Sequence, residues 1–144
     1  MVSSAFVLFT LWVGQTTAAP ATDRDDLLRY LEGSYRLVGK EMNSDKTFLG
    51  KVELKKRGSK LDVVRLINGT RIRGTGWIDF ATADRIKILR MRFHTSKGQF
   101  EGAYMFCSDL ENYARITGYF FPGDKGTIRN PGLEVLFPEA VFSQ

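Results

Sequence analysis

The feature that most constrains the fold of this chain is a stretch with the signature of a β-hairpin, Lys60 to Phe80, with the sequence KLDVVRLINGTRIRGTGWIDF. Two extended runs flank Asn68-Gly69, the residue pair that best tolerates the positive φ angles of a type I′ turn. Side chains alternate between the two faces of a strand, so a turn at this pair decides which residues point inward. The pairs expected to face each other are Ile67 and Thr70, Arg65 and Ile72, Val63 and Gly74, and Leu61 and Gly76.

The chain after residue 33 repeats this rhythm of short alternating runs and turns. From Phe48 to Lys56, apolar residues and glycine alternate with charged residues, as in a strand with one buried face. The phase of the run from Arg85 to Phe93 slips in the middle, which predicts a β-bulge near Ile88-Leu89. Besides the hairpin, the pattern predicts strands at residues 34–41, 48–56, 85–93, 99–107, 113–121 and 132–137.

Eight strands joined by short connections predict an all-β fold, an antiparallel up-and-down barrel over residues 34–138 with a C-terminal tail at residues 139–144. Closure into a barrel removes exposed strand edges. A β-sandwich is the competing architecture. Several glycines fall inside the expected strands, where they would permit bends or make room in the interior of a barrel.

The first 33 residues follow a different pattern. Residues 1–19 carry no charged side chain, and the apolar run Ala5 to Val13 is followed by small residues up to Ala19, which predicts a signal peptide. That run is too short to span a bilayer, no later segment could cross a membrane as a helix, and no cysteine follows the run to carry a lipid anchor. We therefore expect a secreted or periplasmic protein, the alternative being a short apolar tail that is buried or disordered.

Residues 20–33 predict a linker and a short helix. Thr22 is the expected N-cap, three aspartates follow in the first turn, and Gly33 ends the helix. Three turns of helix are not stable in isolation. We therefore expect this helix to act as a lid or plug on the barrel.

Few residues of this chain are candidates for catalysis. There is one histidine, His94, at an expected turn, and one cysteine, Cys107, among apolar residues where a buried, inert thiol is expected. This pair is too few for the usual zinc sites. Glu53, Glu101 and Glu134 fall on the outward phase of their strands, so no pair of inward acids is expected, and a barrel-type isomerase or cyclase would need an inward acid. We expect a protein that is not an enzyme, without a catalytic residue, metal or cofactor.

The segment Leu31-Glu32-Gly33-Ser34-Tyr35 resembles the G-x-W opening of lipocalins, with Tyr35 at the tryptophan position. The later segments FLGKVEL, LDVVRLINGTRIRGTGWI, FEGAYMF and RITGYF are similar in their glycine and aromatic spacing to lipocalin-like, or calycin-type, eight-stranded barrels, including small exported bacterial versions. The resemblance runs from Gly33 to about Phe137. It implies a barrel that acts by non-covalent binding.

The expected interior is apolar except for Arg65, which lies in phase with Val63 and Ile67. A buried guanidinium group needs a partner, and a ligand carboxylate or phosphate, a buried acid of the chain, or solvent at the rim would serve. If a ligand serves, Arg65→Leu should weaken the binding of an acidic ligand while folding survives. The alternative is an interior packed by its own side chains. The candidate binding residues for a small apolar or amphipathic ligand are Arg65, Phe48, Val63, Ile72, Phe100 and Tyr104.

The chain carries a net charge of +5, which favours acidic partners. Much of this charge falls on the outward phase of neighbouring strands, on Lys51, Lys55, Arg71, Arg73, Lys87, Arg90 and Arg92. Such a surface suits lipid headgroups or anionic glycans, whereas nucleic acid is not expected because Trp77 alone supplies an aromatic ring on that face. The alternative function is therefore a secreted or envelope protein that uses this basic face, and a merely solvated face is the simplest interpretation. Asn68-Gly69-Thr70 is also a sequon for N-glycosylation.

Overall fold

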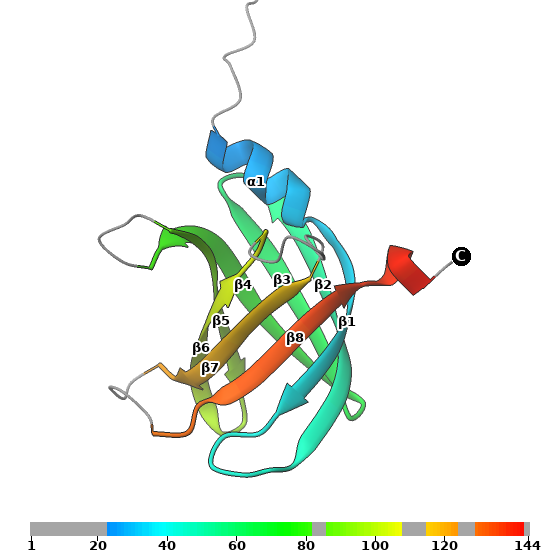
Figure 1. Cartoon of the computed structure of the whole chain (residues 1–144), viewed down its shortest axis with the longest axis vertical. Coiled ribbons are helices and arrows are strands. Elements are labelled where there is room, and N and C mark those ends of the chain that lie inside the picture. The colour runs from blue at the N-terminus through cyan, green and yellow to red at the C-terminus, as the bar shows by residue number, and fades with distance from the viewer. Residues whose placement is uncertain (1–22, 82–85, 108–114, 124–128, 143–144) are drawn as a thin grey trace, which may run out of the picture.

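The eight expected strands form a closed barrel. The computed structural model describes residues 23–81, 86–107, 115–123 and 129–142. Within them every strand pairs antiparallel with its neighbours in sequence, and the last strand pairs with the first (Figure 1). This closure confirms the up-and-down barrel and excludes the sandwich. The elements are α1 (Asp23–Leu31), β1 (Gly33–Lys40), β2 (Thr47–Arg57), β3 (Lys60–Ile67), β4 (Thr70–Phe80), β5 (Lys87–Thr95), β6 (Gly98–Met105), β7 (Ile116–Pro122), β8 (Gly132–Pro138) and the 3-10 helix η1 (Glu139–Phe142).

The turn between β3 and β4 has the geometry that its sequence predicts. Asn68 and Gly69 adopt φ angles of 49° and 77°, so both central residues are left-handed, as a type I′ turn requires. Arg65 consequently lies opposite Ile72, and the other three expected pairs are also observed. The hairpin therefore directs the Arg65 side chain into the barrel.

The predicted bulge in β5 is wrong. The β4–β5 ladder is continuous, with Asp79 opposite Ile88 and Ile78 opposite Leu89. Ile88 thus points to the outer face of the sheet, where it is nevertheless buried. The alternation of apolar and charged residues is broken because Ile88 is an apolar residue on the outer face, not because β5 contains an inserted residue.

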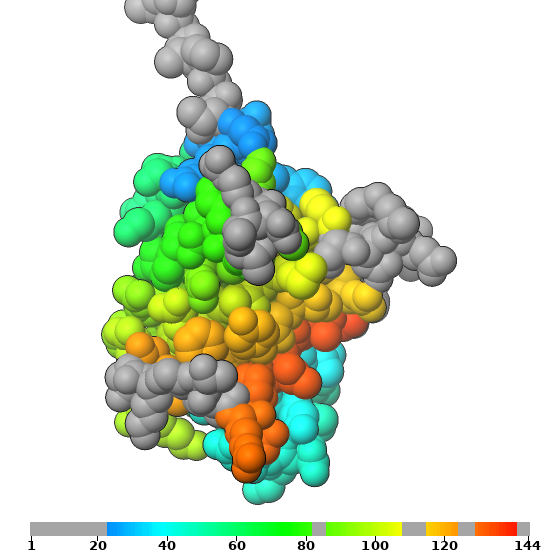
Figure 2. Space-filling model, turned by 60° about the vertical axis from the view of Figure 1, so that its left-hand side comes forward, coloured from blue at the N-terminus to red at the C-terminus, as the bar shows by residue number. Residues whose placement is uncertain are grey.

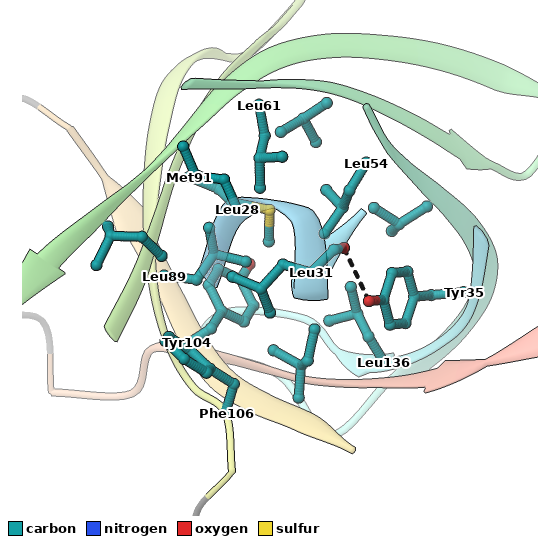
Figure 3. Packing of buried hydrophobic residues seen from close by; sticks show 14 of the residues in the cluster. Leu28, Leu31, Tyr35, Leu54, Leu61, Leu89, Met91, Tyr104, Phe106 and Leu136 are labelled. Carbon is teal, nitrogen blue, oxygen red and sulfur yellow. Dashed lines mark hydrogen bonds between the residues drawn. The ribbon is translucent and has the colours of Figure 1, made fainter. Parts of the chain in front are cut away.

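The short helix α1 closes one end of the barrel (Figure 1). Leu28 and Leu31 are fully buried among strand side chains, which Figure 3 shows around them. The Tyr35 hydroxyl donates a hydrogen bond of 2.8 Å to the carbonyl oxygen of Leu31, which ties the end of the helix to β1. Lys56 on β2 forms an ion pair of 2.8 Å with Asp25. The helix is therefore the plug that the sequence predicts, whereas the expected signal peptide and N-cap lie outside the described residues.

In-strand glycines make room for aromatic rings in the interior. Tyr104 lies opposite Gly118, and a Cβ at Gly118 would overlap both the Tyr104 ring and the backbone of β6. The same relation holds between Phe48 and Gly39, and between Phe120 and Gly132. The glycine and aromatic spacing of the sequence therefore reflects rings that lie over glycines of the paired strand.

The cysteine is not buried. Cys107 follows β6 with a φ angle of 54° and is exposed, so the expectation of a buried thiol is wrong. It shares the outward phase with Met105, which is also exposed, while Phe106 points inward. Of the apolar residues near Cys107 in the sequence, Phe106 points into the barrel and Met105 points to the outside. Apolar neighbours in the sequence were therefore no evidence that Cys107 is buried.

Figure 2 shows the outer wall of the barrel with α1 above it and the strand colours passing across it in bands. No helix in the described part of the chain is both long and apolar enough to cross a membrane.

Candidate functional site

A pocket of about 350 Å³ lies at the end of the barrel opposite α1. It is bordered by the connections between β1 and β2, β3 and β4, and β5 and β6. The polar residues around it are Glu41, Arg65, Asn68, Thr70, Thr95, Ser96 and Lys97, and the apolar ones are Met42, Phe48, Ile67, Ile72, Phe93, Phe100 and Phe120. The barrel thus has one end sealed by a helix and one end that contains a cavity.

Four phenylalanines form the aromatic wall of this pocket. Phe93 and Phe100 stack with their centroids 5.7 Å apart and an angle of 16° between the rings. Phe120 contacts both of these rings and also Phe48, at centroid distances of 6.2 to 6.4 Å. Such ring pairs add about 0.5–1.5 kcal/mol each beyond the area they bury. The wall is therefore a packed, preformed surface rather than a set of independent side chains.

Arg65 and Glu134 form an ion pair inside the barrel. Arg65 is 1% exposed and Glu134 2% exposed, and Nη2 of the arginine donates to Oε1 of the carboxylate. The Tyr104 hydroxyl donates to Oε2 of Glu134 at 2.6 Å. The guanidinium carbon lies 4.1 Å from the centroid of the Phe93 ring. Of the three partners considered for Arg65, a buried acid of the chain is the one observed.

The protonation states of this cluster follow from its surroundings. Burial acts to lower the pKa of Arg65, but the carboxylate of Glu134 outweighs it and raises that pKa, so the guanidinium group is charged. Burial, and then the charge of Glu134, raise the pKa of Tyr104 well above 10, so the phenol stays neutral. The cluster therefore combines the Arg65–Glu134 ion pair with a neutral phenol.

The hydrogen-bonding capacity of Arg65 is not exhausted by Glu134. Its Nε and Nη1 atoms are buried, and neither has a hydrogen-bond partner among the described residues. A buried N–H group without an acceptor costs about 1–3 kcal/mol. Arg65, which lines the pocket, therefore holds two enclosed donor groups that an acceptor would stabilise.

The expectation that Glu134 points outward is wrong. In β8 the inward residues are Gly132, Glu134 and Leu136, while Leu133 and Val135 lie on the outer face. Apolar residues thus occupy both faces of this strand, and its alternation could not identify the inner one. The signal that could have placed Glu134 inside is Arg65, because a buried guanidinium group requires a compensating charge.

Four of the six predicted ligand-binding residues line the pocket, namely Arg65, Phe48, Ile72 and Phe100. Val63 belongs instead to the core nearer the helix, and Tyr104 is fully buried beside Glu134. Phe93 and Phe120 also line the pocket, although neither was among the predicted residues. The inward orientation of Phe93 could have been predicted from its alternation with the charged residues Arg90 and Arg92. The orientation of Phe120 could not, because Phe121 follows it and either ring could have pointed inward.

The seven predicted basic residues all lie on the outer surface, but most are paired with acids. Lys51 pairs with Glu139 at 2.9 Å, and Lys87 pairs with Asp23. Arg90 contacts Asp79 and Glu101, and Arg92 contacts Glu101 and lies over the ring of Trp77. Lys55, Arg71 and Arg73 form no ion pair with any described residue. The basic face is therefore largely neutralised where the structure describes it.

Glu134 is the only acid buried within the described ranges. Both of its oxygens are engaged, one by Arg65 and one by Tyr104. In the part of the chain that the structure covers, no three residues of the histidine, cysteine, aspartate and glutamate types gather as metal ligands would. The chemistry that this arrangement supports best is hydrogen bonding at the inner end of an apolar pocket.

No protein-family model matches this chain, and no curated protein matches it.

Proposed function

We propose that this protein is an exported, lipocalin-like barrel that binds a small amphipathic ligand non-covalently in the pocket opposite α1. The observation that carries the proposal is a preformed cavity with an aromatic wall and polar groups at its inner end and rim. Ligand sites typically have volumes of about 300–1,000 Å³, are mostly apolar and contain a few placed polar groups. At about 350 Å³ this pocket suits a small ligand.

Features of the sequence and of the fold support the remaining parts of the proposal, the lipocalin-like character and the export. This chain shares two features with lipocalin-like barrels, the opening segment around Tyr35 and the closure of eight strands into a barrel. The uncharged apolar run in residues 1–19 supports export. The alternative, a surface protein that uses the basic outer face, has weaker support because acids of the chain neutralise four of its seven basic residues.

Binding of the neutral fluorophore N-phenyl-1-naphthylamine tests the proposal. We expect saturable binding with an increase in fluorescence, since the probe would leave water for the aromatic wall. Ile72 lines the pocket, and Ile72→Trp would fill part of the cavity, so we expect this variant to bind the probe at least about tenfold more weakly, a change of about 1.4 kcal/mol. Leu66→Trp is the matched control, because Leu66 is exposed on the outer face of the same hairpin.

Two results would refute the proposal. One is a folded wild-type protein that neither binds the probe nor carries a co-purified ligand in native mass spectrometry. The other is equal loss of probe binding in the Ile72→Trp and Leu66→Trp variants, which would place the probe elsewhere. Circular dichroism of both variants establishes that they retain the barrel.

A further inference from the structure

We infer that the pocket selects an uncharged ligand bearing a hydrogen-bond acceptor, such as a ketone or amide carbonyl, over the corresponding carboxylate. This inference rests on the proposed function and names the ligand class of the same site. Arg65 would contact the acceptor. The inference reverses the expectation from the sequence alone, in which an unpaired Arg65 would favour an acidic ligand.

The charges at the site are already balanced within the chain. Glu134 already neutralises Arg65, and the Tyr104 hydroxyl stabilises the second carboxylate oxygen. At the rim, Lys97 and Glu41 contribute one charge of each sign. A ligand carboxylate at the inner end would therefore add an uncompensated negative charge close to the buried Glu134. Removing a charge from water without a new counter-charge is far costlier than removing a neutral polar group.

Arg65 also has two donor atoms without an acceptor among the described residues. Nε and Nη1 are N–H groups and can only donate, so the group that satisfies them must accept. Phe93 covers one face of the guanidinium group, its centroid 4.1 Å from the guanidinium carbon, and Glu134 occupies Nη2. The Nε and Nη1 edge is enclosed by protein, so an incoming acceptor would reach it by displacing the side chains around it. Carbonyl oxygens satisfy such donors without adding a charge.

The apolar wall restricts the rest of the ligand. Phe48, Phe100 and Phe120 provide the surface between the rim and Arg65. A ligand that places an acceptor against the guanidinium edge would therefore lie with its hydrocarbon part along these rings. A short alkyl ketone or primary amide has both features.

Competition between ligands of matched size tests the inference. N-phenyl-1-naphthylamine is bound first, then displaced by 2-nonanone, octanamide or octanoate, which have the same number of non-hydrogen atoms. At about pH 8 octanoate is ionised. We expect the ketone and the amide to displace the probe at concentrations at least about tenfold lower than octanoate does, a difference of about 1.4 kcal/mol.

A conservative variant tests the contact between the ligand acceptor and Arg65. Arg65→Lys keeps a positive charge opposite Glu134 but removes Nε and Nη1. We expect it to weaken displacement by the ketone and the amide at least about threefold, because a lysine is a single point donor, while octanoate stays the weakest competitor because Glu134 is still present. Arg73→Lys makes the same change on the outer face of β4, where Arg73 is exposed, and should leave displacement by all three ligands as in the wild-type protein.

The outcomes separate this inference from the proposed function. If the probe does not bind the wild-type protein, both fail. If the probe binds but octanoate competes as well as the amide, the pocket is a ligand site and the inference about its selectivity is wrong. If Arg65→Lys and Arg73→Lys bind the ketone and the amide equally well, the assignment of the acceptor contact to Arg65 is wrong.

Discussion

Arg65 and Glu134 place two charges in the interior, and each is tolerated because of the other. Removing one partner of a buried ion pair typically costs about 3–5 kcal/mol, since the remaining charge is left without compensation. We therefore expect Arg65→Leu or Glu134→Leu alone to lower the free energy of unfolding by about this amount. The sequence led to the expectation that folding survives Arg65→Leu, and the ion pair with Glu134 adds a cost in stability that this expectation did not include.

The double variant Arg65→Leu/Glu134→Leu distinguishes the cost of an unpaired charge from the cost of lost packing. Replacing both members of a buried pair by apolar residues is often neutral. We expect the double variant to recover most of the stability that either single variant loses, as measured by urea denaturation followed by circular dichroism. Losses that simply add in the double variant would show that the two side chains contribute independently.

At the scale of single elements, α1 tests whether the two ends of the barrel are independent. Leu28 is fully buried in the core cluster, whereas none of the residues that line the pocket belongs to the helix. We expect Leu28→Ala to lower the free energy of unfolding by about 2–5 kcal/mol through the cavity it creates. In the protein that remains folded, the affinity for N-phenyl-1-naphthylamine should stay within about twofold, because distant sites without shared partners act additively.

Arg24→Ala is the matched control within α1. Arg24 is exposed, so this change should alter stability by less than about 0.5 kcal/mol. A large loss of probe affinity in folded Leu28→Ala protein would mean that the sealed end and the pocket are mechanically coupled.

Elements with one decisive local signal were predictable from the sequence. Asn68-Gly69 determined both the turn and the register of β3 and β4, and the helix before Gly33 was identified by its aspartates and leucines. Phase was predictable only where polar and apolar residues alternate. In β5 an outward isoleucine, Ile88, imitated a bulge, and in β8 apolar residues on both faces concealed Glu134.

The candidate site was predictable only in part because it depends on contacts between distant strands. The inward phase of Arg65 follows from its own hairpin. Its partner Glu134 lies 69 residues away in sequence, and its pairing depends on how the barrel closes through β8. A local sequence pattern contains no information about which residue of a distant strand pairs with Arg65. The same holds for the choice between a packed interior and a pocket, which depends on where Phe93 and Phe120 meet.

For the molecule as a whole, alkaline pH should weaken the barrel through its buried tyrosines. Burial raises the pKa of Tyr35 to about 12 and that of Tyr104 well above 10. Tyrosine in an unfolded chain titrates near pH 10. Above that pH the unfolded chain releases protons that the folded barrel retains, so the free energy of unfolding falls as the pH rises. For each such tyrosine the slope is about 1.4 kcal/mol per pH unit, and below about pH 10 its contribution is complete.

Urea denaturation between about pH 9 and pH 12 measures this slope. Lysines titrate in the same window, so the comparison between variants is diagnostic rather than the slope of the wild-type protein alone. Tyr35→Phe removes one group with a raised pKa and should flatten the decline between pH 10 and 12 by about 1.4 kcal/mol per pH unit. Tyr119→Phe, at a tyrosine that is 46% exposed, is the matched control. A Tyr35→Phe slope equal to that of the wild-type protein would mean that Tyr35 ionises without unfolding the barrel, and that its hydrogen bond to Leu31 does not hold α1 in place.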